Sequence, residues 1–484
     1  MTGIPGIPGT PGIPGATGTP NSDPNSLPAP GAARAWTPAS WRTRPQAQAP
    51  TYADCARLES VEKRLASLPP LVTSWEIESL KEELAQAARG ERFVLQGGDC
   101  AEALSDCRPE PLASKLKILL QMSLVLIHGS KKPVVRIGRF AGQYAKPRTS
   151  ATETRTVGGV LTTLPSYFGD LVNRPEFDEV SRRPDPGLLL EAYQHSALTL
   201  NFIRSLVDGG FADLHHPEYW DLSFMRHARL SPEVRGEYER MTRNLADGLR
   251  FMEALGERTV EDLARAEFYT SHEGLNLYYE ASQTRQVPRR KGWYDLTTHL
   301  PWIGERTRQL DGAHVEFFRG INNPVGVKVG PKAAPADVVT LARLLNPSDE
   351  PGKLVLISRL GAGEVARALP PLLHAIAKAG IKAAWISDPM HGNGTTTAGG
   401  IKTRSFDAIL SELEQAFAIH QREGIPMAGV HFELTGEDVT ECIGGASGLS
   451  EQDLSTNYAS ACDPRLNYQQ SLEMAFLLAK RMAS

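Results

Sequence analysis

The chain has 484 residues, of which 41% are hydrophobic and 22% charged, and its formal net charge is −4. This length and composition are typical of a globular protein with one large barrel-type domain or two to three smaller domains. The small net charge, without a long basic stripe, argues against nucleic acid as a partner.

The five cysteines and the first residues of the chain indicate a cytoplasmic protein. An odd number of scattered cysteines does not make a disulfide framework, so a reducing compartment is expected. The N-terminus lacks the basic start and the apolar stretch of a signal peptide. No apolar run approaches the length of a bilayer span, so no membrane partner is expected.

Glycine occupies every third position over residues 3–20, which is the spacing of collagen. Six triplets are short for a triple helix, and the Pro- and Ala-rich sequence that follows does not continue them. A disordered tail over residues 1–50 is therefore preferred to a collagen-like segment. Its removal is expected to leave the fold and the activity intact.

Two helices are expected before the first strand, over residues 52–68 and 75–91. Thr73 and Glu76 have the spacing of a capping box at the start of the second helix. The helices form a predicted extension over residues 51–92, which packs outside the main fold or in a subunit interface.

From residue 93 onward, short apolar runs alternate with amphipathic segments, which is the pattern of strands and helices in an α/β protein. Eight strands are expected, the number that closes a (β/α)8 TIM barrel, over residues 93–484. The expected strands are 93–98, 134–140, 267–273, 297–304, 325–330, 354–359, 383–389 and 429–436.

The connection between the second and third predicted strands is too long for a single crossover. It contains two amphipathic stretches, near residues 187–207 and 231–255. We therefore predict a helical insertion over about residues 160–260.

Almost every predicted strand ends in a polar or charged residue, and the strand ends of a (β/α)8 barrel meet on one face, where catalytic sites are built. The cations among them predict a site for a multiply charged anion, since arginine binds phosphate and carboxylate groups through two hydrogen bonds. Taken singly, each arginine fits a structural ion pair equally well. The cationic set is Arg139, Lys146, Arg148, Arg306, Arg308, Lys328 and Arg359.

A second group of these residues has the ligand types of a borderline divalent metal, namely Cys100, His391, Glu433 and Asp463. They lack the local spacing of a metal motif such as CxxC or HExxH. A lone histidine at a strand end is more often part of hydrogen-bonded structure, and a lone cysteine is more often part of the core. From the residues alone, the metal site and this structural alternative both stay open.

Six longer motifs occur in order between about residue 51 and the C-terminus. They are 94-VLQGGDCAE-102, 139-RFAGQYAKPRT-149, 302-WIGERTRQLDGAHVEFFRGINNPVGVKVGP-331, 385-WISDPMHGN-393, 431-HFELTGEDVTEC-442 and 461-ACDPRLN-467. Together they resemble the type II 3-deoxy-D-arabino-heptulosonate 7-phosphate (DAHP) synthases. This resemblance implies a (β/α)8 barrel that condenses phosphoenolpyruvate with erythrose 4-phosphate to DAHP and phosphate, the first step of the shikimate pathway.

The resemblance also implies roles for individual residues, motif by motif. The implied ligands of a divalent metal, Mn²⁺ or else Co²⁺ or a similar ion, are Cys100, His391, Glu433 and Asp463. The implied phosphoenolpyruvate contacts are Arg139, Glu305, Arg306, Lys328 and Arg359. The implied erythrose 4-phosphate contacts are Lys146, Arg148 and Thr149, and Glu273 is a candidate for stabilising a cationic intermediate.

Further implications are a homodimer or homotetramer held by the extra helices, feedback by aromatic amino acids, and chorismate mutase as a candidate partner. The chain departs from the family pattern at Gly394, where threonine is usual, and at Phe168, where arginine is usual. Lys402 and Arg404 either face substrate or begin the next helix. Two alternatives are a secondary-metabolism relative, for phenazine supply or for aminoDAHP in an ansamycin pathway, and a non-catalytic protein that binds a partner.

Overall fold

The computed structural model describes residues 36–208, 232–254 and 268–483. The chain divides into two units, Met1–Thr37 and Pro38–Ser484. The glycine-rich repeat of the predicted tail lies outside the described residues, and the architecture below is that of the second unit.

Eight parallel strands close into a barrel in which their order around the ring is their order along the chain. The closure joins the first strand to the last, with Val94 opposite Gly429 on one side and Val135 on the other. All eight predicted strands are present, and the predicted (β/α)8 fold is confirmed. The barrel strands are β1 Phe93–Gly98, β2 Val134–Arg139, β5 Phe268–Glu273, β8 Leu300–Ile303, β9 Val325–Val329, β10 Leu354–Ser358, β11 Ala384–Ser387 and β14 Gly429–Glu433.

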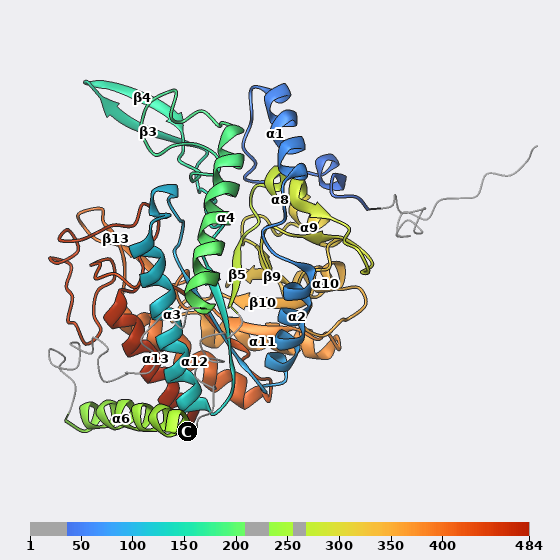
Figure 1. Ribbon diagram of the computed structural model, residues 1–484. Helices are drawn as coiled ribbons and strands as arrows, with labels where there is room; N and C mark the ends of the chain where they lie inside the picture. Colours follow the sequence, from blue (N-terminus) through green and yellow to red (C-terminus); the bar gives the residue numbers. More distant parts are fainter. Residues whose placement is uncertain (1–35, 209–231, 255–267, 484) are drawn as a thin grey trace, which may run out of the picture. The chain divides into compact units, whose positions relative to one another are not determined.

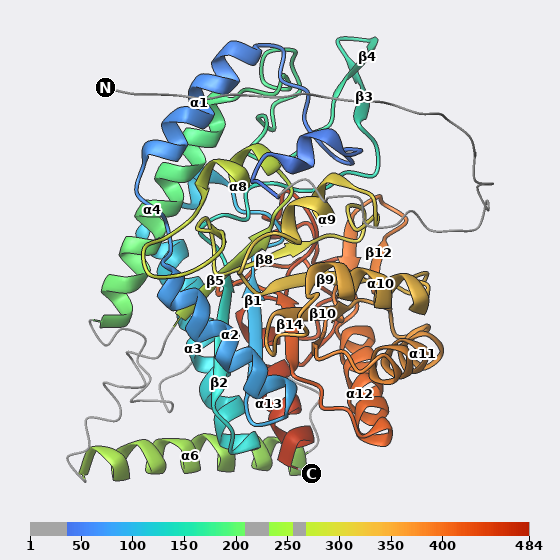
Figure 2. The ribbon, with the colours of Figure 1, turned by 90° about the vertical axis from the view of Figure 1, so that its right-hand side faces the viewer.

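Helices cover the outside of the barrel (Figure 1, Figure 2). They include α3 Pro109–Ser130, α9 Ala313–Phe318, α10 Pro335–Leu345, α11 Val365–Lys378, α12 Phe406–Glu423 and α13 Tyr468–Ala483. Among the described residues, α3 alone is long and apolar enough to cross a membrane, which differs from the sequence-based expectation. Most of its apolar window is buried, because α3 packs against α13 and the barrel. Burial in the core therefore accounts for this apolar composition.

The N-terminal extension consists of α1 Cys55–Ser67 and α2 Ser74–Ala88. The predicted capping box is present at α2: the Thr73 hydroxyl accepts the Glu76 N–H at 3.3 Å, and the Glu76 carboxylate accepts the Thr73 N–H at 2.7 Å. Helix α1 packs with α4 Gly187–Asp208 and α8 Leu277–Gln283 (Figure 2), and their apolar side chains form a second core outside the barrel.

Ordered structure begins before the predicted boundary at residue 50. Trp41, in the short helix η1 Ser40–Thr43, is 1% exposed and packs edge-on against the Tyr278 ring at 5.0 Å between centroids. The Pro45 carbonyl accepts the Ala313 N–H at 2.9 Å. Residues 38–50 therefore belong to the compact unit, because a buried tryptophan and a backbone hydrogen bond fix them to α8 and α9.

The predicted insertion lies between β2 and β5 and contains α4 and α6 Pro232–Ala254. An antiparallel hairpin that was not predicted from the sequence precedes them, β3 Thr152–Val157 with β4 Val160–Pro165. Gly158 and Gly159 have φ of +58° and +85°, and consecutive positive values are typical of a tight hairpin turn. Residues 209–231 and 255–267 lie outside the described structure.

The remaining short elements lie in the loops. They are η2 Leu104–Asp106, the pair β6 Thr284–Arg285 and β7 Tyr294–Asp295, and the pair β12 Gly394–Thr396 and β13 Lys402–Arg404. The last pair occupies the loop between β11 and α12, next to the carboxyl ends of the barrel strands.

Candidate active site

A cavity of about 210 Å³ lies at the carboxyl ends of the barrel strands. Each of the eight strands, or the loop that follows it, contributes a side chain to its wall. The predicted site residues that line it are Cys100, Arg139, Lys146, Glu273, Glu305, Arg306, Lys328, Arg359, His391, Glu433 and Asp463. Residues that are up to 363 positions apart in sequence thus meet because parallel strand ends share one face of the barrel.

A second cavity of about 370 Å³ adjoins the first, since Lys146, Arg306 and Asp463 line both. It is lined by Arg148 and Thr149, the two implied erythrose 4-phosphate contacts that are missing from the first cavity. The Thr149 hydroxyl accepts a hydrogen bond from the Arg306 guanidinium at 3.0 Å, which ties the wall of one cavity to the other. Every residue to which the family resemblance assigns a role therefore lines one of the two cavities, whereas Arg308 of the cationic set lines neither.

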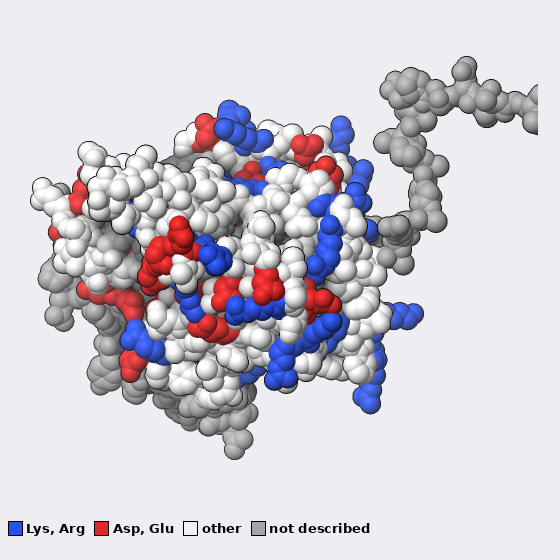
Figure 3. All heavy atoms as spheres, turned by 90° about the horizontal axis from the view of Figure 1, so that it is seen from above, with Lys and Arg blue, Asp and Glu red and all other residues white. Residues whose placement is uncertain are grey.

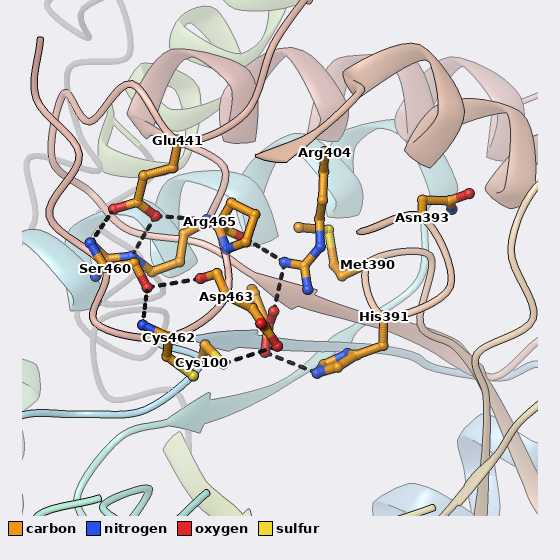
Figure 4. Close-up of polar contacts among 12 residues, drawn as sticks. Cys100, Met390, His391, Asn393, Arg404, Glu441, Ser460, Cys462, Asp463 and Arg465 are labelled. Carbon is orange, nitrogen blue, oxygen red and sulfur yellow. Dashed lines mark hydrogen bonds and ion pairs between the residues drawn. The ribbon is translucent and has the colours of Figure 1, made fainter. Parts of the chain in front are cut away.

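The four predicted metal ligands fall into two groups that share Asp463: Cys100, Cys462 and Asp463, and His391, Glu433 and Asp463. Figure 4 shows Cys100, His391 and Asp463 close together. His391 Nε2 is 3.0 Å from Glu433 Oε1, and Cys100 Sγ is 3.8 Å from Asp463 Oδ2. Cys462 adds a second thiol beside Cys100 and Asp463, and the ligand atoms in each group of three lie within 4.8 Å of one another. An imidazole, a thiol and two carboxylates that converge at such distances fit a borderline divalent cation.

Electrostatic interactions keep the two carboxylates of this cluster ionised. Burial alone would raise the pKa of Glu433, but His391, Arg404 and Arg139 hold that pKa well below its usual value. Burial likewise opposes ionisation of Asp463, whose pKa is lowered by the neighbouring Lys146 ammonium. The cluster therefore presents negative oxygen atoms to any cation that enters it.

The imidazole and the thiol of the cluster are shifted in pKa as well. Burial would lower the pKa of His391, but the carboxylates of Asp388 and Glu433 raise it. Burial and the neighbouring Cys462 raise the pKa of the Cys100 thiol well above its usual value. A divalent cation favours the thiolate and the neutral imidazole, so metal binding at these groups would release protons.

Positive charge is concentrated inside the first cavity. The Arg139 side chain is 2% exposed, and its guanidinium contacts His431 Nε2 at 2.7 Å and Glu433 Oε1 at 3.2 Å. Lys328 is buried as well, and burial lowers its pKa to about 8 although Asp388 opposes this shift. On the face seen in Figure 3, Lys and Arg side chains are interspersed with Asp and Glu. Arg139 and Lys328 place buried positive charge in the cavity wall, beside its carboxylates.

Two predicted residues also make structural contacts. Arg308 of the cationic set pairs with Glu305 at 2.8 Å and lines neither cavity, so the ion-pair alternative holds for this arginine. The other oxygen of Glu305 accepts the Gly330 N–H at 2.8 Å and thereby ties the loop after β8 to the loop after β9.

The loop after β11 contains residues whose roles the sequence left open. Arg404 lies on β13, is buried, and forms an ion pair with Glu433 Oε2 at 2.6 Å. Lys402 pairs with Asp463 Oδ1 at 3.1 Å and lines the second cavity. Neither residue begins α12. Gly394 is exposed at the start of β12 and has open space around it.

Phe168 packs against the second core, and its side chain lines neither cavity. Its carbonyl accepts the Lys146 N–H at 2.9 Å, so this position supports a cavity residue through the backbone. The other side chains that sequence reasoning missed are Asp388, which contacts His391, and Cys462. A signal for Asp388 was available, because the two residues are three apart at the end of one strand.

The fold and the site are those of a (β/α)8 barrel enzyme, with cations and a Cys–His–carboxylate cluster gathered at the carboxyl ends of the strands. The chain belongs to the class-II DAHP synthetase family, whose family model matches residues 36–479. The family expected from the motifs is thus confirmed. The family model matches from residue 36, whereas the motifs begin after residue 51, so the match includes the ordered residues before that position.

Two relatives cover nearly the whole chain. One, from Neurospora crassa, is named phospho-2-dehydro-3-deoxyheptonate aldolase and is 48% identical over 463 residues, which is 92% of this chain and 94% of the relative. A protein of the same name from Streptomyces coelicolor is 45% identical over 441 residues, or 91% of this chain and 96% of the relative. Membership of the family implies a divalent metal, for which the four-residue cluster supplies candidate ligands.

Proposed function

We propose that this protein condenses phosphoenolpyruvate with erythrose 4-phosphate to DAHP and phosphate, and so carries out the first step of the shikimate pathway. The observation that carries the proposal is the convergence of Cys100, His391, Glu433 and Asp463 with buried cations on one face of the barrel. Relatives named for the aldolase reaction support the same activity.

Cys100, His391, Glu433 and Asp463 would hold the divalent metal, with Mn²⁺ as the first candidate and Co²⁺ as another. When bound, such an ion supplies Lewis-acid polarisation of the aldehyde of erythrose 4-phosphate. Asp388 accepts from His391 Nδ1 at 2.8 Å, which leaves His391 Nε2 directed to the cluster. A carboxylate in this position orients a ligating imidazole.

The first cavity binds phosphoenolpyruvate in this proposal. Its phosphate and carboxylate groups require several cations. The lining of this one cavity supplies four of them: Arg139, Arg306, Lys328 and Arg359. Glu305 acts here through its contact with the backbone of Gly330, which fixes the loop beside Lys328. When the cations neutralise the charges of phosphoenolpyruvate and erythrose 4-phosphate, the two substrates can approach each other in a reactive orientation.

The second cavity binds the phosphate of erythrose 4-phosphate through Lys146, Arg148 and Thr149. Lys146 and Asp463 line both cavities, so a substrate whose phosphate lies in the second cavity can extend its aldehyde toward the metal cluster. Lys146 Nζ lies 3.3 Å from Cys100 Sγ, at the junction between the cluster and the phosphate site.

The chemistry follows from this arrangement. Carbon 3 of phosphoenolpyruvate attacks the aldehyde carbon, and the new carbon–carbon bond leaves a cationic carbon 2. The carbonyl electron pair passes to the aldehyde oxygen, which takes up a proton to become a hydroxyl, and a proton is released again when water adds. Glu273 lies in the wall of the first cavity and is the candidate for stabilising that cation. Water then adds to carbon 2, and the hemiketal phosphate collapses with release of inorganic phosphate.

The test is an assay of phosphate release with purified protein, Mn²⁺ and both substrates. Release that requires both phosphoenolpyruvate and erythrose 4-phosphate supports the proposal. Absence of release with erythrose 4-phosphate contradicts it, and a parallel assay with a nitrogen-bearing sugar phosphate then tests the aminoDAHP alternative.

We also infer a cytoplasmic homodimer or homotetramer that can associate with a chorismate mutase. The inference of self-association rests on the family resemblance of the extra helices, on which Trp75 of α2 and Leu198 of α4 are 69% and 60% exposed. Sedimentation of the protein alone, and again with a chorismate mutase, tests both inferences.

A further inference from the structure

Asp463 differs from the other three metal-ligand candidates because it lies near the far end of the long loop between β14 and α13, whereas the other three lie on a barrel strand or within a few residues of its end. It belongs to residues 459–467, here called the return segment, which follows β14 and folds back to Cys100 (Figure 4). The barrel itself therefore does not determine the distance between Cys100 and Asp463.

Glu441 holds the backbone of the return segment. Its Oε1 accepts the Ser460 N–H at 2.8 Å, and its Oε2 accepts the Arg465 N–H at 2.7 Å. Within the segment, the Ser460 hydroxyl donates to the Asp463 carbonyl at 2.8 Å. Glu441 is fully buried, so these hydrogen bonds replace the solvation that its charge has lost.

Arg465 joins the return segment to the end of β1. Its guanidinium donates to Glu441 Oε1 at 2.8 Å and to Asp99 Oδ1 at 2.6 Å, and Asp99 directly precedes Cys100. Asp99 also pairs with Lys115 of α3. The four side chains are buried and their charges alternate, so each ion has a partner of the opposite sign.

Arg465 and Glu441 line neither of the two cavities. A guanidinium is planar and presents its donors in a rigid fork, so one arginine fixes the separation of two carboxylates. Here Asp99 directly precedes Cys100, and Glu441 is hydrogen-bonded to the return segment that carries Asp463.

We propose that Arg465 is a positioning residue of the metal site, which sets the distance between Cys100 and Asp463 by joining Asp99 to Glu441. The inference rests on the proposed metal-dependent function. A lysine at this position keeps the charge but reaches only one of the two carboxylates. Arg465→Lys should therefore loosen the return segment without changing the charge of the site.

The experiment measures Mn²⁺ binding to the full-length protein after chelation, by titration calorimetry or electron paramagnetic resonance. For Arg465→Lys we expect the Kd for Mn²⁺ to rise by about 10- to 100-fold, the usual effect of losing a group that orients metal ligands. The Kd for phosphoenolpyruvate without metal should change much less, because its cationic contacts come from other elements.

The matched control is Arg136→Lys. Arg136 is a buried arginine of β2 that donates to the Ser123 hydroxyl at 2.7 Å and lines neither cavity. The Arg136→Lys substitution should lower the unfolding temperature while leaving the Kd for Mn²⁺ unchanged. This comparison separates positioning of the ligands from a general loss of stability.

Failure of the two proposals can be told apart. If the wild-type protein does not bind Mn²⁺ or another divalent ion, the proposed function itself is contradicted. If the wild type binds Mn²⁺ and Arg465→Lys binds it equally well, the positioning role is overturned. Should Arg465→Lys not fold, Glu441→Gln weakens the same link, and a folded Glu441→Gln protein with wild-type affinity overturns the proposal as well.

Discussion

One oxygen of Asp388 contacts both His391 and Lys328: Oδ2 accepts from His391 Nδ1 at 2.8 Å and pairs with the Lys328 ammonium. Burial alone would raise the pKa of Asp388, but His391 and Lys328 hold it well below its usual value. A single ionised carboxylate thus connects the metal cluster with the cations of the first cavity.

Replacing Asp388 with asparagine should weaken metal binding. Asn removes the charge that orients His391, so we expect the Mn²⁺ concentration for half-maximal activity to rise by about 10- to 100-fold. Phosphate release measured over a range of Mn²⁺ concentrations tests this. Asp337→Asn, in the exposed first turn of α10, is the control and should behave as wild type. If Asp388→Asn shows the same Mn²⁺ dependence as wild type, Asp388 does not orient His391 for metal binding.

The affinity for phosphoenolpyruvate should depend on pH through Lys328. Burial lowers the pKa of Lys328 to about 8, so its ammonium loses a proton as the pH rises through that value. The cation that binds the anionic substrate is present below this pH and lost above it, so the KM for phosphoenolpyruvate should rise toward alkaline pH. In Lys328→Arg the side chain stays charged, and this rise should disappear. A KM that is constant over the same range argues against the assignment.

Arg148 should act on one substrate only. Removal of a hydrogen bond to a charged group costs about 1.5–3 kcal/mol, so Arg148→Ala should raise the KM for erythrose 4-phosphate by about 10- to 100-fold. The KM for phosphoenolpyruvate should stay near wild type, because Arg148 lines only the second cavity. Arg367→Ala, on the exposed side of α11, is the control. Equal effects on both substrates would argue against separate binding sites.

Removing the metal should stop the reaction reversibly. A chelator should abolish phosphate release, and added Mn²⁺ should restore it in the wild type but not in His391→Ala, which lacks a ligand of the cluster. His374→Ala changes an exposed histidine of α11 that pairs with Glu423, and activity should return as in wild type. Full activity in the chelated protein would exclude a metal requirement.

Truncation should distinguish the two parts of the N-terminal segment. A chain that begins at residue 36 should keep wild-type stability and activity, whereas one that begins at residue 51 loses Trp41 from the core. Truncation of a buried tryptophan costs about 3–5 kcal/mol, so chemical denaturation should reveal a loss of that order. The shorter chain should also bind erythrose 4-phosphate less well, since Gln48 Oε1 accepts the Arg148 N–H at 2.7 Å. If the two truncated chains are equally stable, residues 36–50 do not stabilise the fold, and the tail ends at residue 50 as first predicted.

Some elements of this structure could be predicted from the sequence because they depend on local interactions. The apolar run of β1 and the capping box of Thr73 and Glu76 depend on neighbours a few residues away, so pattern and spacing sufficed. The strand count then brought Cys100, His391 and Glu433 to one face, because every parallel strand of a closed barrel ends there. The hairpin around Gly158 has a local signal too, in the consecutive glycines Gly158 and Gly159.

The sequence by itself determined the barrel, the family and the residue types that meet at the strand ends. The tertiary structure decided which groups hold them. Arg404 pairs with Glu433, Arg465 links Asp99 to Glu441, and Trp41 packs on Tyr278, all across long sequence separations. Such pairings depend on how loops fold back over the barrel, and the energy of a buried ion pair comes from geometry that no local pattern encodes.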